Sequence, residues 1–193
     1  MTEIPSTRTS ASIQACFHLM ERYEMLEHIR AHSIMVAKVA RVIAKSLKQE
    51  GMDVSVSKTT VGALLHDIGK TASLASGGDH AEMGRLICIQ NAFSEVADIV
   101  GEHVNIRHYR PEAALSEKEI VYYSDKRVNH DQIVSLDERL AYILERYGGK
   151  HELIHQKIRD NFNLCRRVEA RLFGLVDFAP DSLPRLAEKE GLF

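Results

Sequence analysis

The sequence predicts an all-α protein that folds as a single helical bundle. Apolar residues recur three and four positions apart through most of the chain, which is the spacing of helices with one buried face. No segment shows sustained alternation of apolar and polar residues between turn residues, as a strand would. At 193 residues with 45% hydrophobic content, the chain can bury one sizeable core, and it shows neither a repeat nor a linker. We therefore expect one domain over residues 10–193, after a flexible tail over residues 1–9.

The first two helices are predicted over residues 10–25 and 26–49, and Gly51 ends the second. His32 falls on the buried stripe of the second helix. It is in line there with three aliphatic residues, Val36, Val39 and Ile43. A lone histidine in such a stripe usually hydrogen-bonds a carbonyl group. By itself, His32 therefore indicates no function.

A third helix is predicted to follow Ser57, its N-cap, and to end at Gly69. Near its end it carries His66 and Asp67, which are both costly to bury without a partner. A divalent metal would satisfy the imidazole and the carboxylate together. A hydrogen-bonded pair at a partly hydrated helix end is the alternative, and the pair alone does not decide between them.

The next stretch combines a loop with two shorter helices. Residues 71–78 are rich in glycine and serine, which predicts a mobile loop. Asp79 is expected to cap a helix that begins at His80, and Ser94 to cap another with His103 near its C-terminal end. Both histidines are therefore predicted at or near helix ends.

Two helices after a predicted loop over residues 105–115 begin with capping boxes. Each box pairs a serine with the glutamate three positions later: Ser116 with Glu119, and Ser135 with Glu138. The first of these helices carries Asp125. The second is predicted to reach Tyr147, where two glycines stop it.

The C-terminal part is predicted as one long amphipathic helix over residues 150–173 and a short helix over residues 182–190. The long helix starts with the His-Glu-x-x-His pattern of zinc proteases at residues 151–155. Glycines precede this match and charged residues follow it, which favours a solvated helix start. The apolar stripe of the long helix could close the core or support a homodimer.

Composition argues against several classes of partner. The formal net charge is −2 and no run of lysine or arginine stands out, so no duplex nucleic acid is expected. No apolar run reaches the length of a membrane span, and the polar N-terminus lacks a signal core. The three cysteines are widely spaced within apolar helical patterns, as reduced thiols of a cytoplasmic protein would be.

Six residues of metal-ligand type are each on, or near the end of, an apolar helix: His32, His66, Asp67, His80, His103 and Asp125. Each alone has a structural explanation, but one metal centre in the core of a bundle would satisfy them all. Their order along the chain resembles the HD-domain superfamily of metal-dependent phosphohydrolases. The letters His-Asp-Ile-Gly at residues 66–69 are the signature of its HDIG subgroup. The resemblance covers residues 25–147, and residues 150–193 lie outside it.

The resemblance implies a centre of two divalent transition-metal ions within an HD-type bundle. One ion would be held by four residues: His32, His66, Asp67 and Asp125. The other would be held by His80 and His103, with the Asp67 carboxylate bridging the two ions. We expect iron or manganese, with zinc, cobalt and nickel as alternatives, because imidazole-rich ligation does not suit magnesium.

The implied activity is hydrolysis of a phosphate ester or anhydride in a small phosphorylated substrate, with a nucleotide expected. A hydroxide bridging the two metal ions would be the nucleophile. Asp67 and Lys70 would be catalytic, Lys70 by stabilising charge on the phosphate oxygens. Substrate contacts are expected from five basic residues: Lys70, Arg107, His108, Arg110 and Arg127.

Other functions use related residues. The segment after Asp125 lacks the Glu-Pro continuation of the dinucleoside tetraphosphate hydrolases, which counts against that substrate. Some relatives fill this ligand set with mixed-valence iron for oxygen-dependent cleavage. Others are non-catalytic signalling modules that have lost ligands. All six ligand residues are present in this chain, which favours an enzyme. Hydrolysis is the commoner chemistry of the superfamily.

Overall fold

The structure is a computed structural model that describes residues 8–149 and 151–192, with side chains from residue 13 onward. The expected tail lies outside the described residues, except for residues 8 and 9, which already belong to the first helix. In chain order the helices are α1 (Arg8–Arg22), α2 (Glu27–Gln49), α3 (Val56–Leu65), α4 (Lys70–Ser76), α5 (His80–Gln90), α6 (Ala97–Glu102), α7 (Glu117–Lys126), α8 (Leu136–Tyr147), α9 (Glu152–Phe173) and α10 (Leu183–Glu188). The predicted all-α fold is confirmed.

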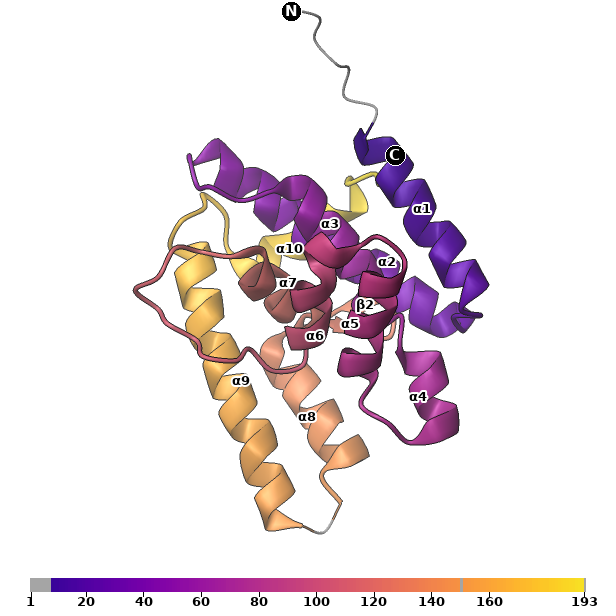
Figure 1. Cartoon of the computed structure of the whole chain (residues 1–193). Helices are drawn as coiled ribbons and strands as arrows, with labels where there is room; N and C mark the ends of the chain where they lie inside the picture. Colours follow the sequence, from indigo (N-terminus) through magenta and orange to yellow (C-terminus); the bar gives the residue numbers. More distant parts are fainter. Residues whose placement is uncertain (1–7, 150, 193) are drawn as a thin grey trace, which may run out of the picture.

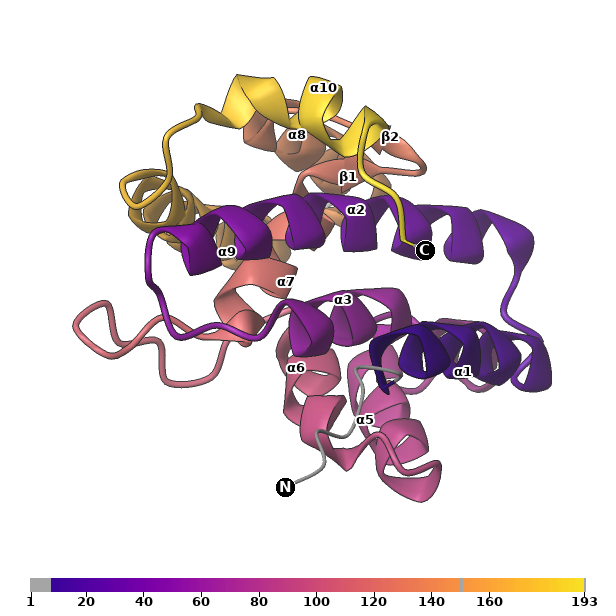
Figure 2. The same cartoon turned by 90° about the horizontal axis from the view of Figure 1, so that it is seen from above.

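Helix α2 is the central element of the bundle. It crosses the molecule between α10 and the β-strands on one side and α3, α5 and α6 on the other (Figure 2). Its predicted stripe is buried, including Val36, Val39 and Ile43, and His32 lies in the same stripe. Helices α8 and α9 form an antiparallel pair that projects from the bundle (Figure 1).

A short hairpin between α7 and α8 was not predicted. Strand β1 (Val128–Asn129) pairs antiparallel with β2 (Gln132–Ile133), so only two residues form the turn. Strands this short contain no alternation of apolar and polar residues for a pattern to reveal. The hairpin packs against α2, and it matters for the candidate site described below.

Three predicted helix starts are confirmed by their caps. Asp79 caps α5 by accepting backbone amides of its first turn. Both predicted capping boxes are present: Ser116 with Glu119, and Ser135 with Glu138. Two predictions were wrong. Helix α3 is capped by Ser55 instead of Ser57, because the backbone is extended at residue 55, and Ser94 begins a 3₁₀ turn (Ser94–Val96) instead of capping a helix.

Helix α3 ends just before the His-Asp pair, not after it as predicted. Residues 66–69 form a turn in which the amides of Ile68 and Lys70 bond to carbonyl groups three residues earlier. The His66 imidazole also bonds to the carbonyl oxygen of Ala63, at 2.7 Å. Two of the acceptors, the carbonyl groups of Ala63 and Leu65, are at the helix end and would otherwise lack partners. The pair therefore lies outside the regular helix, where its backbone is free to turn toward α5.

The glycine- and serine-rich segment predicted as a mobile loop is mostly helical. Helix α4 covers residues 70–76 and ends at Gly77, which has the left-handed backbone conformation (φ +76°) of a common helix C-cap. Alanine and leucine within the segment favour a helix despite the serines. No side chain of α4 is buried, so α4 lies on the surface of the bundle.

The C-terminal helices complete the core that the motif-bearing part begins. Tyr122 and Tyr123 are fully buried on α7, and their hydroxyl groups donate to Asn161 and Glu169 on α9, both at 2.6 Å. Glu190, just beyond the end of α10, accepts hydrogen bonds from α2. A short 3₁₀ turn (Pro180–Ser182) precedes α10. We propose that this part and the motif-bearing part are one domain.

The single-domain proposal predicts a large cost for truncating a buried residue of α9. Leu172→Ala is expected to destabilise the whole protein by about 2–5 kcal/mol, because Leu172 is fully buried in the shared core. Urea denaturation followed by circular dichroism would measure this in one cooperative transition. Leu153→Ala, on the same helix at 79% exposure, should change stability little. Two separate transitions would contradict the proposal.

Three smaller predictions also have structural outcomes. The three cysteines are buried free thiols, as expected. The protease-like match at residues 151–155 begins α9, with His151 and Glu152 exposed to solvent. Among the described helices, none combines the length and apolarity needed to cross a membrane.

Candidate metal centre

The six predicted ligand residues meet at one place, although they come from five separate segments. His32 comes from α2, and Asp125 from α7. His80 is the first residue of α5. The turn after α3 and the C-terminal end of α6 supply the other three: His66, Asp67 and His103. Two groups of three have ligand atoms within 4.8 Å of one another: His32, His66 and Asp67, and Asp67, His80 and His103.

Asp67 belongs to both groups and gives one carboxylate oxygen to each. Its Oδ2 is 3.5 Å from His66 Nε2 and 4.0 Å from His32 Nε2. Its Oδ1 is 3.5 Å from the Nε2 atoms of both His80 and His103. A carboxylate divided in this way can bridge two cations.

Asp125 on α7 adds a second carboxylate to the group of His32, His66 and Asp67. Its Oδ1 lies 3.1 Å from His32 Nε2 and 3.7 Å from His66 Nε2. The first group therefore offers two imidazoles and two carboxylates, and the second offers two imidazoles and the shared carboxylate. Nitrogen and oxygen donors in this combination suit first-row transition metals.

Backbone carbonyl groups orient three of the imidazoles. Each carbonyl oxygen lies within hydrogen-bond distance of a ring Nδ1: His130 for His32 (2.8 Å), Ala63 for His66 (2.7 Å) and Val100 for His103 (2.6 Å). With the proton on Nδ1, each ring can offer its Nε2 atom, which faces the cluster, to a cation.

The carbonyl group that orients His32 comes from the unpredicted hairpin. His130 is in its turn with a left-handed backbone (φ +55°), which is uncommon for a residue other than glycine. Sequence reasoning missed this contact because every residue has a carbonyl group. Only the tertiary structure shows which carbonyl lies behind His32.

The cluster contains buried polar atoms that lack partners. Among the described residues, three buried side-chain atoms make no hydrogen bond, and two of them are His66 Nε2 and Asp67 Oδ1. The His66 residue is fully buried and Asp67 is 1% exposed. An unsatisfied buried polar atom costs about 1–3 kcal/mol. A cation within each group would satisfy these two atoms, so the residues fit a metal centre.

The two carboxylates are negatively charged despite their position. Burial alone would raise the pKa of Asp67, but the neighbouring His66 and His103 imidazoles contribute to holding this pKa well below its ordinary value. Burial also opposes ionisation of Asp125, and contact with His32 helps to keep its pKa low. The protein therefore presents two anionic ligands to a cation.

The cluster opens to solvent on one side. The side chains of His80, Lys70 and Asp125 are 28%, 35% and 16% exposed, whereas that of His103 is 2% exposed. Burial and the nearby His103 lower the pKa of His80 to about 4, which makes its imidazole neutral near pH 7. Lys70 Nζ donates to Asp67 Oδ2 at 2.8 Å; burial opposes its charge, but Asp67 raises its pKa. The opening therefore presents the ammonium group of Lys70 beside the two carboxylates.

Gly69 allows the His-Asp turn to pack closely against α5. A Cβ atom at this position would collide with the carbonyl oxygen of His80 and would lie 2.6 Å from the amide nitrogen of Gly84. Because His80 begins α5, this close approach helps to bring its imidazole within 3.5 Å of Asp67. The glycine of the His-Asp-Ile-Gly motif is therefore explained by packing.

Gly69→Ala is predicted to damage the candidate centre. The added methyl group should push α5 away from the turn, destabilising the protein by about 1–3 kcal/mol and weakening metal binding. Urea denaturation and titration with Mn²⁺ would measure the two effects. Gly174→Ala, whose Cβ would lie 3.1 Å from the carbonyl oxygen of Ala170 at the end of α9, is the control and should leave the Mn²⁺ affinity unchanged. Wild-type Mn²⁺ affinity in Gly69→Ala would contradict this explanation.

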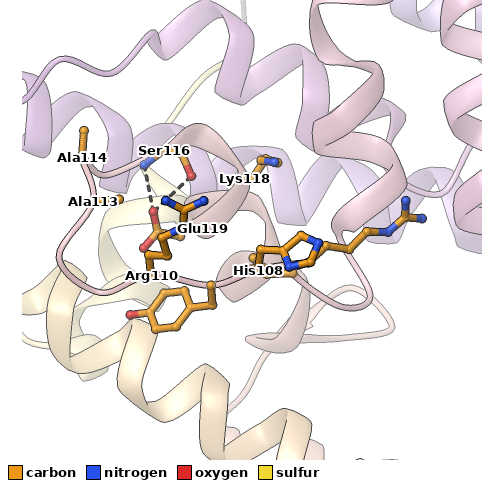
Figure 3. Close-up of a pocket in the computed structure, with 10 residues that line it drawn as sticks. His108, Arg110, Ala113, Ala114, Ser116, Lys118 and Glu119 are labelled. Carbon is orange, nitrogen blue, oxygen red and sulfur yellow. Dashed lines mark hydrogen bonds between the residues drawn. The ribbon is translucent and has the colours of Figure 1, made fainter.

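The basic residues predicted to bind substrate do not all approach the cluster. Arg107, His108 and Arg110 lie on the loop after α6 and line a pocket of about 170 Å³ with Lys118 and Glu119 (Figure 3). None of the six clustered residues lines this pocket. The loop follows His103 directly in the chain.

Arg127 points away from the cluster. It is 3% exposed, and its guanidinium donates to the hydroxyl of Tyr123 at 2.5 Å and to Glu169 at 3.3 Å. Its Nε donates to the carbonyl oxygen of Val134 at 2.6 Å. These contacts join α7 to α9 and to the segment after β2. The structure therefore supports a packing role for Arg127 instead of the expected substrate contact.

An all-α bundle with these histidines and aspartates in this order has the architecture of an HD domain. The HD domain family matches residues 29–130, and the chain belongs to this family. The match does not test the HDIG subgroup, which stays a prediction. The C-terminal helices lie outside the matched region.

Several curated proteins are similar to the chain. An uncharacterized protein of Methanocaldococcus jannaschii is 26% identical over 145 residues, which cover 68% of this chain and 85% of that protein. Ribonuclease Y of Treponema denticola is 31% identical over 147 residues, 71% of this chain but 27% of that enzyme. A tRNA (cytidine(56)-2'-O)-methyltransferase of Thermoplasma volcanium is 26% identical over 150 residues, covering 77% of this chain and 40% of that protein. No solved structure gives a significant match.

Proposed function

We propose that the protein is a phosphohydrolase or phosphodiesterase that uses two divalent transition-metal ions, iron or manganese. The observation that carries the proposal is the Asp67 carboxylate, whose two oxygens face two separate groups of histidines. Membership of the HD domain family, whose members are typically metal-dependent phosphohydrolases, supports it.

In this proposal the chain contributes ligands, charge and orientation. Divalent ions bound at the cluster would supply Lewis acidity toward a phosphate group and a water molecule of lowered pKa. Asp67 would belong to both metal sites; the other ligands would be His32, His66 and Asp125 for one ion, and His80 and His103 for the other. Lys70, at the opening, would stabilise negative charge that develops on the phosphate oxygens.

The proposed substrate is a nucleotide or another small phosphorylated metabolite. The positive charge of Lys70 at the opening supports an anionic substrate. Arg107, His108 and Arg110 on the adjoining loop would contact its more distant part. Two of the similar proteins are named as enzymes that act on RNA, and one of these is a ribonuclease, which supports a nucleotide phosphodiester. Because the chain matches 27% and 40% of their lengths, their whole activities are not transferred.

The test is hydrolysis by protein loaded with Mn²⁺ or, without oxygen, with Fe²⁺. Bis(p-nitrophenyl) phosphate, nucleoside phosphates, dinucleotides and a short single-stranded RNA would form the panel. We expect turnover of at least one substrate that is lost on chelation and restored by metal. Oxygen consumption by the iron-loaded protein without phosphate-ester turnover would favour the oxygenase alternative. Full metal loading with no turnover at all would favour a non-catalytic module.

Two other expectations stay predictions. They are the cytoplasmic location and the self-association through the long C-terminal helix. The buried part of α9 already serves the intramolecular core, with Phe162, Cys165, Val168 and Leu172 facing inward.

A further inference from the structure

Lys126 is a buried lysine next to a candidate metal ligand. The residue is 5% exposed, and its Nζ lies 3.8 Å from the centre of the Tyr122 ring. The ammonium donates to the carbonyl oxygen of His103 at 2.9 Å and approaches the carbonyl oxygen of Tyr122 at 3.4 Å. It also lies 3.6 Å from Asp125 Oδ2. One side chain therefore contacts the backbone of one candidate ligand and the carboxylate of another.

A lysine is an expensive choice for this position. A charged ammonium loses its hydration on burial, and a methionine or leucine would fill similar space without that cost. The carbonyl groups and the aromatic ring compensate only partly, and the Asp125 carboxylate at 3.6 Å adds an ion pair. Packing alone therefore does not explain why the residue is lysine. What lysine adds is a donor that reaches from α7 to the end of α6.

The contact with His103 joins the two groups of ligands. His103 caps the C-terminal end of α6 and belongs to the group with His80, whereas Asp125 belongs to the group with His32. The residues of the first ligand group are held in place by α2, by α3 and by the hairpin between α7 and α8. At the His103 end of the second group, the side chain of Lys126, the residue after Asp125, links α7 to the carbonyl oxygen of His103 at the end of α6.

We propose that Lys126 is a positioning residue that holds His103 in register with the first group, so that binding of the second metal ion depends on it. The inference rests on the proposed two-metal function. Residues that orient metal ligands typically change metal affinity by about 10–100-fold when they are replaced.

The test is titration of the metal-free protein with Mn²⁺, with each binding step measured by isothermal titration calorimetry. The wild type should bind two ions, and His80→Ala should identify which step belongs to the second group. Lys126→Met should weaken that step by about 10–100-fold and leave the first step within about threefold. Removal of the positive charge beside Asp125 would, if anything, strengthen the first step. This split between the two steps is the signature of positioning.

Lys118→Met is the matched control. Lys118 also lies on α7 and pairs with Glu102 on α6 at 3.0 Å, so it links the same two helices through a residue that is not a candidate ligand. Both Mn²⁺ steps should be unchanged in this variant. Thermal unfolding of each metal-free variant would show whether Lys126→Met is folded. If it is not, Lys126→Gln, which keeps an N–H donor of shorter reach, is titrated instead with the same criterion.

The outcomes are distinct from those of the proposed function. Equal weakening of both Mn²⁺ steps, wild-type affinity for the second ion, or the binding of only one ion by the wild type would each overturn the positioning role. Two-step binding with the expected split, but no hydrolysis of any substrate, would refute the proposed activity and leave the positioning role intact.

Discussion

Asp67→Asn is expected to abolish metal-dependent hydrolysis. Asparagine keeps the size of the side chain but carries one carbonyl oxygen and no charge, so it cannot serve both groups of histidines. Its NH₂ group would face one group as a hydrogen-bond donor and could not bind a cation there. We expect turnover to fall by roughly three orders of magnitude or more, equivalent to about 4 kcal/mol of transition-state stabilisation.

The measurement combines turnover with metal content. Asp67→Asn should lose most bound metal at both sites, as detected by elemental analysis after gel filtration. It should remain folded without metal, because removal of a buried negative charge offsets the lost contacts. Asp53→Asn, the same substitution at an exposed position of the connector before α3, is the control. Retention of wild-type turnover by Asp67→Asn would rule out the mechanism.

Lys70→Met is expected to lower kcat by about 10²–10³-fold, the usual cost of removing one donor that stabilises transition-state charge. The ammonium lies 2.8 Å from Asp67 Oδ2 at the open side of the cluster, within reach of a phosphate group bound there. Metal binding should persist, because Lys70 repels cations and provides no ligand. The variant therefore separates a catalytic role from a structural one.

The corresponding measurements are kcat and KM for one substrate of the panel, together with Mn²⁺ titration. Lys58→Met, at an exposed position on α3, is the matched control and should behave as the wild type. A kcat unchanged from the wild type would show that Lys70 is a surface lysine without a catalytic role. Loss of metal binding in parallel with kcat would indicate that Lys70 instead supports the folding of the turn.

The bundle was largely predictable because its signals are local. Helical spacing of apolar residues located most of the helices, and the boxes at Ser116 and Ser135 marked two starts to the residue. Local signals failed where two nearby serines could each cap a helix, and where a segment contains both helix-forming and loop-forming residues. Ser55 was preferred to Ser57 as the cap of α3, and the segment after Lys70 became a helix despite its serines.

The candidate site was partly predictable for a different reason. Histidine and aspartate within apolar stripes are costly in any fold, so their number and order pointed to a shared partner before any distance was known. The backbone features of the site carried no such signal. Neither the turn of residues 66–69 nor the carbonyl group of His130 behind His32 could be recognised from residue type.

By itself, the sequence determined the fold class, because hydrophobic periodicity depends on residue type. It also determined the set of candidate ligand residues, because the cost of burying histidine and aspartate depends on residue type. Only the tertiary structure decided how they meet. It directed the two oxygens of Asp67 to different groups, sent Lys126 toward His103, and turned its neighbour Arg127 toward α9. Adjacent residues on a helix point about 100° apart, and which of them faces the site depends on packing between segments distant in the chain.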